Sequence, residues 1–146
     1  METWRIREVA ELEAVIKAMQ KALMSHDDRA TVLALHGDLG AGKTTFTQTL
    51  AATLGVAEAV TSPTFVIMKG YELSGQPFDQ LIHIDAYRVE QSDELCVLGF
   101  AELLQRPRTL VVIEWAEKVA DLLPDSTIDL TFAINNEERT ITCNYG

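Results

Sequence analysis

Cysteine, long apolar runs and positive charge are all scarce in this sequence, and each shortage excludes a class of protein. The 146 residues include two cysteines, Cys96 and Cys143, which stand far apart and outside any Cys-x-x-Cys pattern. A disulfide framework and a zinc site are therefore not expected, and a reducing compartment is. Cys96 is expected to be a small core residue of a helix.

The hydropathy of the chain is that of a globular protein. No stretch approaches the ~18 consecutive apolar residues of a membrane span, and the N-terminal residues lead into an amphipathic stretch and not into the apolar core of a signal peptide. We therefore expect neither a membrane span nor a signal peptide. The length of 146 residues predicts a single domain over residues 1–146, and a composition of 47% hydrophobic and 23% charged residues excludes a disordered chain.

The charge balance is acidic, with 12 Lys and Arg against 22 Asp and Glu and a net charge of −10. Proteins that hold nucleic acid by themselves usually neutralise its phosphates with a basic face. The sequence contains no basic run, so direct nucleic-acid binding is not expected.

The spacing of apolar residues predicts helices alternating with strands. Helices are expected over residues 9–23, 43–54 (ended by Gly55) and 92–104 (with Ser92 as N-cap), strands over residues 31–35, 65–71, 80–85 and 110–115, and a C-terminal hairpin over residues 127–134 and 139–143 around Asn135-Asn136. This order predicts an α/β fold with a mostly parallel sheet and an antiparallel portion.

The strongest motif lies between the first predicted strand and the second predicted helix. Residues 37–44, GDLGAGKT, match G-x-x-x-x-G-K-[ST] in full, with a chance frequency on the order of one per cent or less. In such a loop the glycines let backbone N–H groups cradle phosphate oxygens, and the helix N-terminus adds partial positive charge. Lys43 would reach the β- and γ-phosphates, and Thr44 would offer a hydroxyl to Mg²⁺. A strand–turn–helix corner that needs glycines would not explain Lys43-Thr44 at this offset.

A P-loop also needs an acid near the metal, at the carboxyl end of a neighbouring apolar strand. Asp85 ends one such strand and Glu114 ends another. Either acid can hold Mg²⁺, directly or through water, while the other orients the attacking water. Charged residues at strand ends are also common as solvated groups, and the P-loop is what favours the functional interpretation.

Four further features have a structural interpretation, beside a functional one or in place of it. Thr61-Ser62-Pro63-Thr64-Phe65 precedes a strand where P-loop proteins keep a γ-phosphate sensor, although Ser-Pro-Thr is also ordinary loop chemistry. His83, alone on an apolar strand, is expected to be a satisfied core histidine. Trp115 either stacks on a base or closes the core, and Arg88 either contacts phosphate or pairs with a carboxylate.

Five segments in this order and spacing resemble the TsaE family, the bacterial ATPases of tRNA threonylcarbamoyladenosine synthesis. They are residues 37–45 (GDLGAGKTT), 61–65 (TSPTF), 83–88 (HIDAYR), Glu94-Leu95 with Gly99, and residues 113–115 (IEW). The resemblance covers residues 8–134. It implies a three-layer P-loop NTPase fold, cytoplasmic hydrolysis of ATP with Mg²⁺, and action on a complex of TsaD and TsaB, with tRNA contacted only indirectly.

The resemblance also implies roles for individual residues. ATP would be bound by Asp38, Leu39, Gly40, Ala41, Gly42, Lys43, Thr44, Thr45 and Trp115; Lys43, Asp85 and Glu114 would be catalytic; Thr44, Glu114 and Asp85 would bind the metal; and Thr61, Ser62 and Thr64 would form a nucleotide-sensing loop. Residues 8–11 are expected to form part of the adenine pocket.

Two other functions fit a P-loop and have to be weighed. A small metabolite kinase needs a lid with arginines, and here Arg106 and Arg108 flank Pro107 in a connection too short for a lid domain. A nucleotide-bound interaction module without turnover would not need Lys43, Thr44 and two acids. A GTPase is disfavoured because no Asn/Thr-Lys-x-Asp motif occurs.

Overall fold

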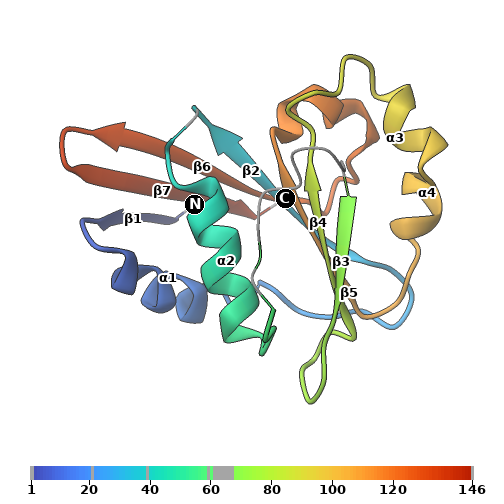
Figure 1. The fold of residues 1–146 in the computed structure, drawn as a ribbon, viewed down its shortest axis with the longest axis horizontal. Coiled ribbons are helices and arrows are strands. Elements are labelled where there is room, and N and C mark those ends of the chain that lie inside the picture. Colours follow the sequence, from blue (N-terminus) through green and yellow to red (C-terminus); the bar gives the residue numbers. More distant parts are fainter. Residues whose placement is uncertain (1, 21, 39, 59, 61–67, 146) are drawn as a thin grey trace.

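The computed structural model describes residues 2–20, 22–38, 40–58, 60 and 68–145. These residues form a seven-stranded sheet in the order β1-β7-β6-β2-β5-β4-β3 (Figure 1). The strands are β1 (Glu2–Ile6), β2 (Thr31–Gly37), β3 (Met68–Glu72), β4 (Gln80–Asp85), β5 (Thr109–Glu114), β6 (Ile128–Asn135) and β7 (Glu138–Tyr145). The helices are α1 (Leu12–Met19), α2 (Lys43–Thr53), α3 (Asp93–Val97) and α4 (Phe100–Leu103), with 3₁₀ segments η1 (Val9–Glu11) and η2 (Ala116–Leu122).

The sheet is mixed, which confirms the α/β class and corrects the expectation of a mostly parallel sheet. The four central strands β6, β2, β5 and β4 run parallel to one another. The pairings β1–β7, β7–β6 and β3–β4 are antiparallel, so the described sheet has as many antiparallel as parallel pairings. The difference comes from β1, whose sequence ETWRI is largely exposed and shows no apolar run.

Two hydrophobic clusters cover the two faces of the sheet because side chains alternate along each strand. Leu33 and Leu35 of β2 pack in the cluster that includes α1 and α2. Val32 and Ala34 of the same strand pack in the cluster that includes α3, α4 and η2. In Figure 1, α1 and α2 accordingly stand together, away from α3 and α4.

The predicted helices differ from the observed ones at positions with a local cause. The first begins as the 3₁₀ segment η1 and ends at Met19. The third is interrupted at Gly99, whose φ of 85° separates α3 from α4. Ser92 stands at the start of α3, but its hydroxyl donates to Asp121 Oδ2 at 2.8 Å and makes no cap. Cys96 is exposed and is not a core residue.

The remaining elements agree with the sequence prediction within a few residues. The strand at residues 80–85 has the predicted bounds, and Gly55 follows α2 with a φ of 86°. The C-terminal hairpin is present, with Asn136 in the left-handed conformation (φ 58°) between Asn135 and Glu138. Residues 65–67 of the predicted third strand lie outside the described residues. None of the described helices is long and apolar enough to cross a membrane.

Gly37, at the end of β2, allows a close approach of two backbones. A Cβ at this position would lie 2.4 Å from the carbonyl oxygen of Phe132, and φ is 138°. We expect Gly37→Ala to lower the free energy of unfolding by at least about 2 kcal/mol, because the backbone must move. In Gly75→Ala, where φ is 69° with no atom within 4 Å, we expect a loss of about 1 kcal/mol. Urea denaturation of both variants checks this, and equal losses would contradict it.

Candidate functional site

The GDLGAGKT loop joins the end of β2 to the start of α2. Gly40 and Gly42 have φ values of 82° and 105°, a conformation that glycine adopts without strain. Gly42 occupies the N-cap position of α2. Because the first N–H groups of a helix have no helical acceptor, this turn leaves backbone donors at the loop for an anion.

Lys43 is the first residue of α2, and its side chain is buried, with 4% of its surface exposed. Its Nζ donates to the carbonyl oxygen of Gly37 at 2.5 Å and lies 3.5 Å from the centroid of the Trp115 ring. Burial lowers the pKa of Lys43, and the nearby carboxylates of Glu117, Glu114, Asp85 and Asp38 oppose this shift. The ammonium group therefore interacts electrostatically with four acidic side chains.

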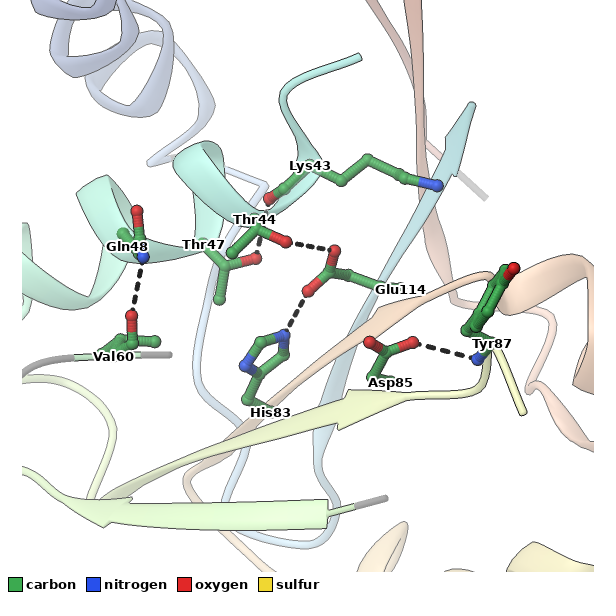
Figure 2. A network of polar contacts seen from close by, with 9 residues as sticks. All are labelled: Lys43, Thr44, Thr47, Gln48, Val60, His83, Asp85, Tyr87 and Glu114. Atoms are coloured by element: carbon green, nitrogen blue, oxygen red, sulfur yellow. Dashed lines mark hydrogen bonds and ion pairs between the residues drawn. The ribbon is translucent and has the colours of Figure 1, made fainter. Parts of the chain in front are cut away.

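Glu114, the last residue of β5, joins the P-loop to the neighbouring strand. Its side chain is buried, with Oε1 accepting a hydrogen bond from Thr44 Oγ1 at 2.8 Å and Oε2 lying 2.5 Å from His83 Nε2 (Figure 2). The parallel pairing of β4 with β5 explains the second contact, since His83 and Glu114 both point to the sheet face covered by α2. A buried carboxylate with two polar partners is held in one orientation.

Asp85 pairs directly with Glu114 in the β4–β5 register, so the two predicted acids lie side by side at the same sheet edge. Asp85 Oδ1 accepts a hydrogen bond from the backbone N–H of Tyr87 at 2.9 Å, which fixes the turn after β4 (Figure 2). The Tyr87 ring lies 5.1 Å from the Trp115 ring, centroid to centroid. Trp115 has a φ of 58°, and such strained non-glycine residues are often found at functional sites.

A cavity of about 140 Å³ opens on the side of the P-loop that faces the N-terminal strand. Its walls combine P-loop residues with the N-terminal segment and the C-terminal hairpin, and they are Ile6, Arg7, Glu8, Val9, Leu12, Ala41, Gly42, Thr45, Phe132 and Arg139. Glu8 and Val9 belong to residues 8–11, which were expected to contribute to a base pocket. Most of the lining is apolar, with charged groups at Arg7, Glu8 and Arg139.

The comparison with known proteins decides the family. The family model described as "Threonylcarbamoyl adenosine biosynthesis protein TsaE" matches residues 6–141. The chain belongs to the TsaE family. Proteins of this family take part in the biosynthesis of threonylcarbamoyladenosine in tRNA.

Relatives support the same assignment. The TsaE protein of Bacillus subtilis (strain 168) is 38% identical over 127 residues, which is 86% of this chain and 77% of that protein. The TsaE protein of Haemophilus influenzae is 32% identical over 119 residues, which is 82% of this chain and 73% of that protein. The crystal structure of Bacillus subtilis YdiB has a TM-score of 0.72 and 32% identity, and covers 99% of this chain and 86% of that one.

Three of the TsaE motif segments meet at one edge of the sheet. Residues 37–45, 83–88 and 113–115 follow or end β2, β4 and β5, whose parallel arrangement brings their carboxyl ends together. Glu94 and Leu95 lie in α3, on the opposite face from α2. Arg88 is exposed just beyond β4. Four predicted site residues lie outside the described residues, namely Leu39, Thr61, Ser62 and Thr64. The side-chain amide of Gln48 donates a hydrogen bond to the carbonyl oxygen of Val60, the residue before Thr61, at 2.8 Å (Figure 2).

Sequence reasoning missed two side-chain arrangements of the TsaE site. The partner of His83 is Glu114 itself; His83 Nδ1 has no hydrogen-bond partner in the described part of the chain. His36, next to Gly37, lies between two carboxylates, with Nε2 2.8 Å from Asp129 Oδ1 and Nδ1 3.2 Å from Glu117 Oε2. Neither arrangement follows a sequence motif, because the partners come from strands and turns distant in the sequence.

Proposed function

We propose that this TsaE protein is a Mg²⁺-dependent ATPase of the P-loop NTPase fold, folded as one cytoplasmic domain. The observation that carries the proposal is the hydrogen bond between Thr44 and Glu114, directly beside Lys43. In P-loop NTPases, the hydroxyl group of the P-loop Ser or Thr and a nearby acidic residue hold the Mg²⁺ ion that accompanies the nucleotide. Fold and family alone would not assign this chemistry.

The proposed placement of ATP follows the two sides of the P-loop. The phosphates lie along the backbone N–H groups of residues 38–45, with the terminal phosphate toward Lys43, Trp115 and Asp85. The base lies in the cavity between Ala41, Thr45 and the N-terminal segment. Because this cavity is largely apolar and carries Glu8 at its wall, it suits a flat ring with polar edges better than the Trp115 side does.

The residues at the strand ends suit Mg²⁺. Thr44, Glu114 and Asp85 offer oxygen donors, the type that Mg²⁺ prefers, and this ion usually takes one or two carboxylates together with phosphate oxygens. No cluster of three or more His, Cys, Asp or Glu among the described residues is arranged to hold a metal by itself. When bound, the ion would neutralise charge on the β- and γ-phosphates. Glu114 and Asp85 would orient the metal hydration shell and the attacking water.

A metabolite kinase is less well supported. Arg108 forms an ion pair with Asp79 at 2.8 Å and stands just before β5. Glu114 is the last residue of β5, on the side of the P-loop, so Arg108 lies at the other end of this strand, away from the P-loop. A lid arginine would have to reach the phosphates.

We propose that the ATPase acts on a complex of TsaB and TsaD and contacts tRNA only through these partners. Phosphoryl transfer is often completed by a group supplied in trans, and here the positive charge of Lys43 is opposed by the electrostatic effect of four carboxylates. The net charge of −10 disfavours direct binding of tRNA by this protein.

We expect slow ATP turnover by the isolated protein, a large increase when TsaB and TsaD are added, and retention of tRNA only by the mixture. Phosphate release and filter retention measure the two quantities, and the Lys43→Ala protein, prepared in the same way, gives the background from contaminating ATPases. Fast turnover by the protein alone, or tight salt-sensitive tRNA binding by it alone, would contradict the proposal.

A further inference from the structure

The two sides of the P-loop differ in charge. On the Glu114 side, four carboxylates act electrostatically on the Lys43 ammonium group, those of Asp38, Asp85, Glu114 and Glu117. On the cavity side, two arginines, Arg7 and Arg139, line the wall with Glu8. A nucleoside diphosphate, which carries its charge along the loop, would find its additional counter-charge on the cavity side.

The arginines at this corner are not equivalent. Arg5 and Arg7 both pair with Glu138, each with its Nε 3.7 Å from a carboxylate oxygen. The side chain of Arg139, the residue after Glu138 in β7, has no hydrogen-bond or ion-pair partner among the described residues. Since successive residues of a strand point to opposite faces, Glu138 neutralises Arg5 and Arg7 while Arg139 faces the other way, toward the P-loop.

Arg139 is held against the loop by its neighbours in the sheet. Its backbone pairs with Ile6 of β1 on one side and with Ile134 of β6 on the other. The side chain passes over Gly42, where a Cβ would lie 3.5 Å from Arg139 Cδ and 3.7 Å from Arg139 Nε. The Arg139 side chain therefore lies against Gly42, the N-cap residue of α2.

We propose that Arg139 is a phosphate-binding residue that contacts the α- and β-phosphate end of the nucleotide. The inference rests on the proposed nucleotide site and adds a residue of the C-terminal hairpin to it. A guanidinium group presents a planar fork of donors that matches two phosphate oxygens, and it keeps its charge at any physiological pH. The loop backbone and Arg139 would then hold the diphosphate from two sides, and Lys43 would serve the γ-phosphate end.

The test compares Arg139→Gln with Arg5→Gln. Both variants lose one positive charge at the same corner, and Arg5, which does not line the cavity, serves as the matched control. By calorimetry at low salt, we expect Arg139→Gln to bind ADP about tenfold more weakly than the wild type, with Arg5→Gln within about twofold. The loss should be similar for ADP and ATP, and it should shrink near 1 M salt, where the Debye length is about 3 Å.

Three results would overturn the inference while leaving the ATPase proposal intact. These are unchanged ADP affinity in Arg139→Gln, equal losses in Arg139→Gln and Arg5→Gln, and a loss confined to ATP, which would place the contact at the γ-phosphate. Failure of the wild type to bind ADP would instead defeat the proposed function itself. Because Arg139 is exposed, the glutamine variant is expected to fold, and equal melting temperatures without nucleotide confirm this.

Discussion

Replacing Lys43 by alanine is expected to weaken ATP binding by roughly a hundredfold. The ammonium group belongs to the first residue of α2, directly after the glycines of the loop, and each charge-assisted contact to phosphate is worth about 1.5–3 kcal/mol. Two such contacts correspond to about a hundredfold in affinity. The substitution removes a buried charge whose desolvation already lowers its pKa, so the fold itself is expected to persist.

Lys118→Ala is the matched control for this experiment. Lys118 also donates to a backbone carbonyl, that of Tyr87, and also lies over an aromatic ring, 5.2 Å from the Tyr87 centroid. It stands outside the P-loop, so its loss should change ATP affinity by no more than a few-fold. Isothermal calorimetry that finds equal ATP affinity in Lys43→Ala and wild type would contradict the assignment of the P-loop.

The sequence predicted the side of the site that depends on local pattern. A full G-x-x-x-x-G-K-[ST] match between an apolar run and a helical pattern placed Lys43 and Thr44 at the start of α2. Two apolar runs that each end in an acid indicated that Asp85 and Glu114 would meet, because the carboxyl ends of parallel strands share one edge. The observed β4–β5 register pairs these two acids directly.

The features that sequence reasoning missed depend on contacts between distant segments. Strand β1 is mostly exposed, and its pairing with β7 decides that it is a strand, so its sequence carries no apolar signal. The place of Arg139 likewise follows from the hairpin register and from the approach of β7 to Gly42. The predicted sensor residues Thr61, Ser62 and Thr64 stay a prediction.

Glu114→Gln and Asp85→Asn are expected to lower partner-stimulated ATP turnover by about 10²–10³, while ADP affinity changes by no more than a few-fold. Both changes remove a negative charge from the region where the metal and the water would be oriented, and leave the backbone cradle in place. Losses of this size are typical when one preorganised electrostatic group is removed. Single-turnover and steady-state phosphate release measure the first effect, and calorimetry with ADP measures the second.

The geometry explains why these variants should keep their fold. In Glu114→Gln the amide oxygen can still accept from Thr44, and the amide nitrogen can donate to His83 Nε2 once the imidazole proton sits on Nδ1. In Asp85→Asn the amide oxygen can still accept from the N–H of Tyr87. Glu117→Gln is the matched control, since Glu117 also acts on Lys43 electrostatically but contacts His36 and neither Thr44 nor His83. If turnover fell equally in all three variants, the loss would reflect net charge around Lys43 and not positioning; full turnover in Glu114→Gln or in Asp85→Asn would remove that residue from the catalytic set.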